Sequence, residues 1–514
     1  MSLYETVLFD YQREAVDRIV ARRSILLADQ PGLGKTVEVL SSLEQAGLFD
    51  KPDAMILVLA PVVAVQSAWR DSIEKWVAPN HRVGVVDLSY GTAKKREDRL
   101  DSFLGELGQP RVVLANHAVL EVHRKNGARF PALFEQVWDA VIIDESHVVL
   151  PISNDRKLTN FWLGLKSLRV ARQGFRLAVS GTPDRGKLEN RYGTYKFLRP
   201  YDFVSVNRWA WLETNFFVSE QKVARGRVVK VVGAVKSKAS WAVTEDSIIV
   251  RRTKAEVLKD LPPKQYNFVE VELYPEQRQD YMSQVRLMTE KKLEADDDGV
   301  ETAAAMVFAL RARQIAACQW SNGKPVVGGK SAKLDWLLEW LAEREGVKVV
   351  VCSQFAQVLR WLEIELVNAG YSVGVLDGGV SASGRASVQA EFQRGALQVC
   401  LISGRMGVGI TLDVADDLIM FDLPYDPDVV EQVEDRVHRA SRNHQVTIWN
   451  LLAIGSIDQL VAKKLNSRYF VTRASMDGRR GIDFEKNVID RLRVGIKMSD
   501  PVDSVSVIEG ETNG

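Results

Sequence analysis

Short apolar runs alternate with longer stretches of helical spacing along most of this chain, and this alternation limits the possible folds more than any other feature. In the first half the runs are Ser24–Ala28, Met55–Ala60, Arg111–Ala115, Ala140–Ile143 and Phe175–Val179. They are apolar throughout, which is typical of strands buried on both faces of a sheet. Strands separated by helices favour a parallel α/β sheet.

The same rhythm begins again in the second half, at Lys348–Cys352, Val373–Leu376, Val399–Ile402, Leu418–Phe421 and Val446–Leu451. The sequence therefore predicts two α/β lobes. The region between them differs, because residues 201–264 are rich in aromatic and basic side chains. Residues 275–317 have helical spacing, which we interpret as one apolar face formed by Tyr281, Val285, Leu287 and Leu293. We expect this region to form mainly helical insertions.

Length and composition fit this division. The 514 residues allow about three domains, or two large ones with insertions. Lys and Arg number 68 against 67 Asp and Glu, which excludes a protein that holds nucleic acid or membrane by a bulk positive field. The three cysteines are far apart and form no CxxC pair, which argues against a disulfide framework or a zinc site. Without a signal-like start or a long apolar segment, we expect a cytoplasmic protein that is neither secreted nor membrane-bound.

A glycine-rich turn follows the first apolar run and ends in Gly-Lys-Thr. Gly32 and Gly34 would let the backbone curl so that its amides point at a phosphate. Lys35 would then contact the β- and γ-phosphates of a nucleotide, and the hydroxyl of Thr36 would hold Mg²⁺. Asp29 occupies the position of the first glycine in the usual GxxxxGK[ST] pattern.

Two adjacent carboxylates end the fourth apolar run. This position places Asp144 and Glu145 at the carboxyl edge of the predicted sheet, where ligands bind in such folds. Asp144 would support Mg²⁺, and Glu145 would orient and deprotonate the attacking water. His147 follows directly and is a candidate for coupling this site to other motifs.

A pair of arginines near the end of the second lobe could complete such a site. Arg436 and Arg439 are three residues apart, so on a helix they would share one face, and Gln432 lies one turn earlier. Two guanidinium groups directed at a γ-phosphate would stabilise the charge of the transition state.

These motifs, in this order, resemble the superfamily-two helicases and, within them, the Swi/Snf-type double-stranded-DNA translocases. The compact insertions and Asp144-Glu-Ser-His147 are most similar to the annealing-helicase branch. The resemblance spans roughly residues 5–465. The other segments that carry it are Leu8–Gln12, Asp29–Thr36, Leu59–Trp76, Leu177–Pro183, Ile249–Lys254, Leu261–Lys264, Lys330–Asp335, Val350–Phe355, Ile402–Leu412 and Gln432–Arg439.

The resemblance implies two RecA-like lobes, with ATP and Mg²⁺ as cofactors. Its ATP-binding residues would be Gln12, which reads adenine, with Asp29, Gly32, Leu33, Gly34, Lys35, Thr36 and Gln432. Coupling would involve His147, Ser180, Gly181 and Thr182. The expected contacts to the DNA backbone lie at Pro61, Trp69, Asn116, Ser353, Gln354, Ser403, Gly407 and Gly409.

The predicted domains are lobe one (1–200), the insertions (201–330), lobe two (331–470), a basic helical segment (471–497) and a disordered acidic tail (498–514). Within the insertions, six bases and no acid lie between Lys222 and Lys238. This run is interpreted either as a solvated loop or as an element that grips DNA.

The leading hypothesis is a DNA-stimulated ATPase that translocates on double-stranded DNA, with forked or single-stranded DNA as further candidate partners and protein partners unknown. A strand-separating DNA or RNA helicase, a remodeller of RNA polymerase or of another DNA-bound protein, and an ATP-binding scaffold without turnover are the alternatives. The compact chain suggests a bacterial or viral protein.

Overall fold

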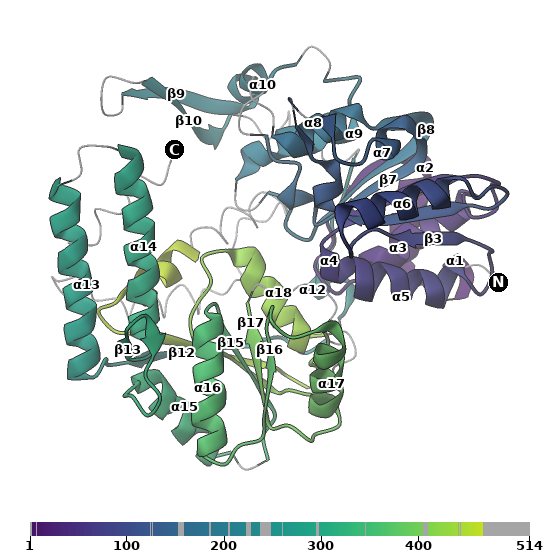
Figure 1. The fold of residues 1–514 in the computed structure, drawn as a ribbon. Coiled ribbons are helices and arrows are strands. Elements are labelled where there is room, and N and C mark those ends of the chain that lie inside the picture. The colour runs from purple at the N-terminus through teal and green to yellow at the C-terminus, as the bar shows by residue number, and fades with distance from the viewer. Residues whose placement is uncertain are drawn as a thin grey trace. The chain divides into compact units, whose positions relative to one another are not determined.

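A computed structural model of the chain contains two compact units, each built on a parallel sheet (Figure 1). The first comprises residues 1–219, 232–259 and 407–409, and the second the remainder. No helix among the described residues is both long and apolar enough to cross a membrane. The structure describes residues 3–6, 8–123, 125, 127–152, 159–184, 187–203, 206–222, 228–236, 248–259, 261–294, 298–344, 346–404, 410–439, 442 and 444–465.

The first unit contains a seven-stranded sheet in the order β11-β1-β8-β7-β2-β4-β3. All its neighbouring strands are parallel, as the sequence predicts. Its strands are β1 (Ser24–Leu27), β2 (Met55–Ala60), β3 (Gly84–Asp87), β4 (Arg111–Asn116), β7 (Val137–Asp144), β8 (Arg169–Val179) and β11 (Ile249–Val250). The helices include α2 (Asp10–Arg22), α3 (Lys35–Gln45), α6 (Ala93–Leu104), α8 (Asn160–Ser167), α9 (Arg191–Leu198) and α10 (Arg208–Asn215).

Burial on both faces of this sheet explains why its strands are apolar throughout. On β1, the consecutive residues Ile25, Leu26 and Leu27 point to alternate faces and none is more than 1% exposed. Residues 65–77, one of the stretches with helical spacing, form a continuous helical segment with two π-turns, Val65–Trp69 and Ile73–Val77, on either side of α5 (Arg70–Ser72).

The second unit contains a six-stranded parallel sheet in the order β12-β19-β18-β15-β17-β16. Its strands are β12 (Gln265–Val271), β15 (Val349–Ser353), β16 (Val373–Leu376), β17 (Val399–Ser403), β18 (Asp417–Met420) and β19 (Thr447–Ala453). Its helices include α13 (Pro275–Glu294), α14 (Asp298–Ala317), α15 (Ala332–Ala342), α16 (Ala356–Asn368), α17 (Ala382–Gln393) and α18 (Pro427–Val437). The two sheets confirm the predicted fold class of two α/β lobes.

The region expected to hold only insertions contributes a strand to each sheet. β11 pairs with β1 of the first sheet and β12 with β19 of the second. The expected helices form as the hairpin of α13 and α14, which lie side by side in Figure 1. Tyr281 packs into the second core, but Leu287 is 42% exposed. Six residues separate the two, which places them on different sides of a helix.

Several sequence predictions lie outside the described residues. These are Gly407 and Gly409, the basic segment 471–497, the acidic tail 498–514 and three of the six bases between Lys222 and Lys238, namely Arg225, Arg227 and Lys238.

Candidate nucleotide and DNA sites

The turn between β1 and α3 has the backbone geometry expected of a phosphate loop. Gly32 and Gly34 have φ values of 86° and 93°, a region that side chains other than glycine rarely adopt. A Cβ atom on Gly34 would also overlap the amide of Gln12. Gly34 caps α3, which begins at Lys35 as predicted. Both glycines are therefore required by conformation, and Gly34 also by space.

Lys35 and Thr36 lie half-buried at the start of α3. The Lys35 ammonium donates hydrogen bonds to the carbonyl oxygens of Asp29 (2.8 Å) and Gln30 (3.4 Å). The ammonium group therefore lies at the loop. A bound phosphate would replace these carbonyl oxygens as its hydrogen-bond acceptor. A curled loop that excludes side chains, with a lysine beside it, fits a nucleotide phosphate.

Gln12 and Leu33 are buried and are bonded to each other. Gln12 Nε2 donates to the Leu33 carbonyl (2.9 Å), and Gln12 Oε1 accepts from the backbone amide of Phe9 (3.0 Å). Gln12 thereby links the start of α2 to the phosphate loop through hydrogen bonds. Its role as an adenine contact remains a prediction. The carboxylate of Asp29 is fully buried and is bonded by the side chain of Arg252.

Asp144 and Glu145 lie at the end of β7, at the carboxyl edge of the sheet. Asp144 Oδ2 accepts from the indole nitrogen of Trp69 (2.9 Å), and Oδ1 accepts from the backbone amide of Glu145 (2.9 Å). His117 Nε2 contacts the Asp144 carbonyl at 2.8 Å, and burial lowers the pKa of His117. Glu145 has a φ of 47°, an uncommon conformation that clusters at functional sites.

His147 joins the carboxylate pair to the predicted coupling motif. Its Nδ1 lies 2.7 Å from Ser180 Oγ and 3.2 Å from Glu145 Oε2. Ser180 Oγ also accepts from the Thr182 amide at 3.2 Å. Gly181 lies against Pro31 of the phosphate loop, where a Cβ would come within 2.7 Å of the proline ring. The structure thus brings together the four residues predicted to couple the two motifs.

Three of the predicted DNA-contact residues that the structure describes lie in the first unit. Ala60, just before Pro61, pairs with Asn116 across β2 and β4, so both residues lie at the same sheet edge. Asn116 Oδ1 accepts from Arg96 at 2.9 Å. Trp69 is fully buried, and its indole bonds Asp144 rather than facing solvent.

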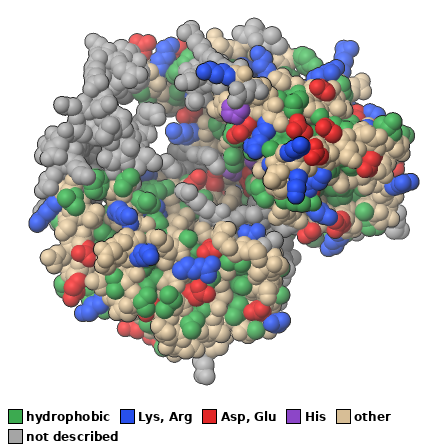
Figure 2. Space-filling model, viewed as in Figure 1, with side chains coloured by type: hydrophobic (Ala, Val, Ile, Leu, Met, Phe, Trp, Pro, Cys, Tyr) green, Lys and Arg blue, Asp and Glu red, His purple; other side chains and the backbone are tan. Residues whose placement is uncertain are grey.

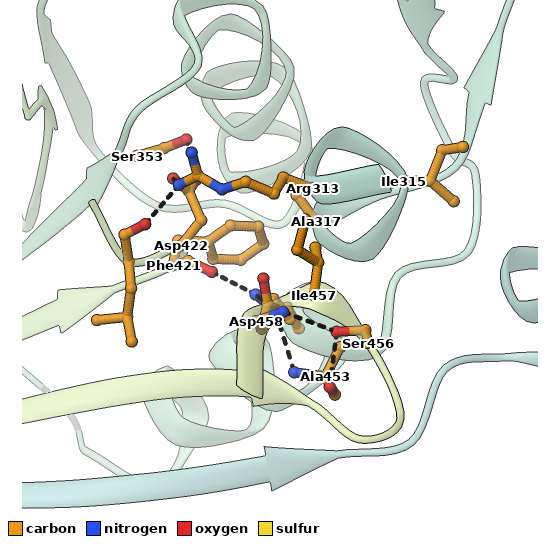
Figure 3. Close-up of polar contacts among 12 residues, drawn as sticks. Arg313, Ile315, Ala317, Ser353, Phe421, Asp422, Ala453, Ser456, Ile457 and Asp458 are labelled. Atoms are coloured by element: carbon orange, nitrogen blue, oxygen red, sulfur yellow. Dashed lines mark hydrogen bonds and ion pairs between the residues drawn. The ribbon is translucent and has the colours of Figure 1, made fainter. Parts of the chain in front are cut away.

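In the second unit, Ser353 and Ser403 end the neighbouring strands β15 and β17 and are aligned in register. Ser353 is fully buried, and its hydroxyl donates to Asp422 Oδ2. Oδ1 of the same carboxylate accepts from the Gln354 amide at 2.9 Å. Figure 3 shows Arg313 of α14 directed at Asp422, and the two groups lie 3.7 Å apart. The strand end that carries Ser353 and Gln354 is therefore held by a buried ion pair.

Arg436 and Arg439 are close in sequence but do not share a helix face. Helix α18 ends at Val437, because His438 leaves the helical conformation and its Nε2 bonds the Pro262 carbonyl at 2.8 Å. Arg439 follows the helix and donates to the Ile410 carbonyl at 3.0 Å. Arg436 is 4% exposed, and burial lowers its pKa to about 10. Gln432 lies half-buried on α18.

Comparison with known families decides the assignment. Residues 11–319 match the SNF2-related domain, and residues 332–441 match the helicase conserved C-terminal domain. The chain belongs to the SNF2-related family.

Two relatives show the breadth of this SNF2-related similarity. The chain is 26% identical over 456 residues to the Arabidopsis thaliana ISWI chromatin-remodeling complex ATPase CHR11, covering 85% of this chain and 40% of the relative. It is 24% identical over 478 residues to the mouse DNA annealing helicase and endonuclease ZRANB3, covering 92% and 41%. The chain thus spans about two-fifths of the length of these relatives.

A solved structure, the Sulfolobus solfataricus SWI2/SNF2 ATPase core in complex with dsDNA, is 22% identical and covers 95% of this chain and 97% of its own, with a TM-score of 0.41.

Sequence reasoning missed two features of the SNF2-related site. The hydrogen bond from Trp69 to Asp144 joins residues 75 positions apart, and the contact of Arg252 with Asp29 joins residues 223 positions apart. The sequence places both Trp69 and Arg252 within family-like motifs, but motif spacing does not show which motifs meet in space.

Proposed function

We propose that this protein is a DNA-stimulated ATPase that uses ATP hydrolysis to translocate along double-stranded DNA. The observation that carries the proposal is the order of three neighbouring strands, β1, β8 and β7. Their carboxyl ends present the phosphate loop, Ser180 and the Asp144–Glu145 pair, and His147 connects the last two. This is the arrangement that a phosphate-cleaving site linked to a second motif requires.

ATP and Mg²⁺ are the cofactors we propose. The glycine-lined loop and Lys35 would hold the phosphates, and Thr36 and Asp144 would hold the metal. Among the described residues no group of three His, Cys, Asp or Glu side chains could hold a metal ion alone. That fits Mg²⁺, which is commonly bound by one or two carboxylates together with phosphate and water. The metal would neutralise charge on the phosphates, while Glu145 would orient water.

Arg436 and Arg439 are the contribution of the second unit that we propose for hydrolysis. Burial disfavours the charged form of both guanidinium groups and lowers the pKa of each, and the charge of Arg439 lowers the pKa of Arg436 further. An anionic phosphate near this pair would offset that cost, which is the electrostatic role expected of an arginine finger.

Duplex DNA is the partner we propose, contacted through the backbone near Pro61, Asn116, Ser353, Gln354 and Ser403. Because the hydroxyl of Ser353 is turned inward to Asp422, backbone amides at this strand end are the better candidates for phosphate contacts. In Figure 2, acidic and basic side chains are intermingled over the visible surface, in keeping with the net charge of +1. Such a surface suits local contacts with the DNA backbone that form and break in each cycle of ATP hydrolysis.

The functional domains we propose follow the predicted ones. ATP binds to the lobe of residues 1–200, and residues 331–470 form the helicase C-terminal lobe. The segment 248–259 is added to the first lobe, because β11 extends its sheet. The matched family ranges, 11–319 and 332–441, support a boundary before the second lobe.

The deciding experiment measures ATP turnover without nucleic acid and with duplex DNA, single-stranded DNA and RNA. We expect duplex DNA to stimulate most. Lys35→Ala and Glu145→Gln should abolish the stimulated rate, whereas Glu106→Gln, at an exposed carboxylate of the same unit, should leave it unchanged. Full turnover in either site variant would show that the site is wrongly assigned.

Translocation is tested separately by displacement of a third strand from a duplex. Displacement without separation of the duplex strands supports the proposal. Strand separation would favour a helicase, and stimulation by RNA alone would exclude the duplex as partner. Nucleotide binding without turnover would identify a scaffold.

A further inference from the structure

The segment 249–254 lies far from the phosphate loop in sequence but runs alongside it in space. β11 pairs with β1, with Val250 opposite Leu27. Beyond the strand ends, the Ala28 amide donates to the Val250 carbonyl (2.7 Å) and the Gln30 amide to the Arg252 carbonyl (3.0 Å). The backbone amide of Lys254 donates to Gln30 Oε1 at 2.7 Å. The segment is therefore bonded to the loop at every second residue from Val250 to Lys254.

The side chain of Arg252 joins the two ends of this loop. Its Nε lies 3.2 Å from Asp29 Oδ1, its backbone amide donates to the same oxygen at 2.8 Å, and Nη2 bonds Asp29 Oδ2. The same Nη2 lies 3.0 Å from Glu38 Oε1. Asp29 lies at the start of the loop and Glu38 in the first turn of α3, so one guanidinium group bonds both ends of the loop.

The surroundings of Arg252 restrict its movement. Its side chain is 11% exposed, and its guanidinium carbon lies 5.1 Å from the centre of the Tyr11 ring. Tyr11 in turn donates to the Leu33 carbonyl of the loop at 3.1 Å. The neighbouring Arg251 donates to the carbonyls of Ala28 (2.6 Å) and Gly181 (2.8 Å). Arg252 is therefore packed and bonded as part of the loop's support.

The contact of Arg252 with Asp29 and Glu38 also affects the charge around the loop. The carboxylates of Asp29 and Glu38 are both fully buried, and Glu38 Oε2 has no hydrogen-bond partner among the described residues. Without Arg252, two buried acids would lie beneath a loop that must accept a polyanion. An uncompensated buried charge is strongly unfavourable, and a second anion close by adds repulsion.

We propose that Arg252 is a positioning residue for nucleotide binding, which fixes the curvature of the phosphate loop through Asp29 and Glu38 and neutralises the charge beneath the phosphates. This inference rests on the proposed ATP-binding function of the loop. It assigns the segment 249–254, which lies within the predicted insertions (201–330), to the nucleotide site.

The test compares Arg252→Met and Arg252→Lys with the wild type, using binding of a fluorescent ADP and the Michaelis parameters for ATP. We expect Arg252→Met to weaken ADP binding and to raise KM at least tenfold, with a smaller change in kcat. The ADP affinity and KM of Arg252→Lys should lie between those of Arg252→Met and the wild type. Arg22→Met, at an exposed arginine of α2 in the same unit, serves as the control and should match the wild type.

The double variant Asp29→Asn/Arg252→Met separates positioning from general damage. If charge beneath the loop matters, removing the unpaired acid should restore at least part of the lost affinity. Unchanged affinity in Arg252→Met, or a double variant that binds no better, overturns the inference. If Arg252→Met melts below the assay temperature, Arg252→Lys and the double variant decide in the same way. Failure of the wild type itself to bind nucleotide would instead refute the proposed function.

Discussion

Replacing Trp69 by Phe should raise the Mg²⁺ requirement of the proposed ATPase. The indole of Trp69 donates to Asp144 Oδ2 at 2.9 Å, and the side chain is fully buried. Phenylalanine keeps most of the packing but removes the donor, so the carboxylate loses one of its two orienting hydrogen bonds. Partners that orient a metal-binding carboxylate strongly affect metal affinity.

The size of the effect follows from the kind of bond that is lost. A hydrogen bond to a charged group contributes about 1.5–3 kcal/mol. At roughly 1.4 kcal/mol per factor of ten, this corresponds to about a 10- to 100-fold rise in the Mg²⁺ concentration at half-maximal ATP turnover. The assay is a Mg²⁺ titration at saturating ATP and duplex DNA.

Trp138 offers a matched control on β7, the strand that ends in Asp144. It too is fully buried and its indole donates at 2.9 Å, but to the backbone carbonyl of Leu133. Trp69→Phe and Trp138→Phe should lose similar stability, about 0.5–3 kcal/mol each, while only Trp69→Phe shifts the Mg²⁺ titration. Equal titrations for both variants would refute the reasoning. A weakened affinity for DNA with an unchanged Mg²⁺ requirement would instead support the sequence prediction of a DNA contact.

Three further outcomes can be measured. Ser180→Ala removes the 2.7 Å contact with His147, and we expect DNA stimulation of ATP turnover to fall about two- to tenfold while the basal rate is kept; equal loss of both rates would contradict coupling. Arg313→Met should weaken DNA binding and lower the melting temperature, because it leaves a buried carboxylate unpaired, whereas Arg311→Met on the exposed face of α14 should do neither. Burial and the nearby Asp29 hold the pKa of Glu38 well above its ordinary 4.5, although Arg252 and Lys35 lower it. The folded state therefore binds this proton more tightly than the unfolded state, so the proton's contribution to stability is lost as pH rises above 4.5. We expect the melting temperature of Glu38→Gln, relative to that of the wild type, to be higher at pH 8 than at pH 5.

The strands that the sequence predicted were those with strong apolar runs. All ten predicted runs overlap observed strands, because burial on both faces leaves a local signal. Three strands of the two sheets were missed, namely β3, β11 and β12. β3 is a four-residue edge strand in which Gly84 and Val85 are not buried. β11 has only two residues, Ile249 and Val250, and β12 is half-exposed along most of its length. Neither a two-residue strand nor a partly exposed edge strand has a pattern that separates it from a loop.

The candidate site was predicted in its residues but only partly in its contacts. Gly32, Gly34 and Asp144 occupy the expected positions, because strand ends and helix starts fix them locally. Arg439 lies beyond its expected helix, because a tertiary contact of His438 accompanies the end of α18. The buried side of the segment follows its spacing, because Val65, Trp69, Ile73 and Val77 lie four residues apart and are all buried. The partner of the Trp69 indole, Asp144, lies 75 positions away and has no local signal.

The place of β11 in the first sheet has a consequence for how the protein is made. During synthesis, β1 and the phosphate loop leave the ribosome more than 200 residues before their neighbour on the open side of the sheet. Until residue 254 has followed, β1 is an edge strand with unpaired amides and carbonyls, a surface prone to pairing with other chains. A fragment that stops near residue 200 would keep every glycine and the lysine of the loop. It would nevertheless lack the strand and the arginine that close the sheet around them, so expression of the first lobe alone should extend at least to residue 259.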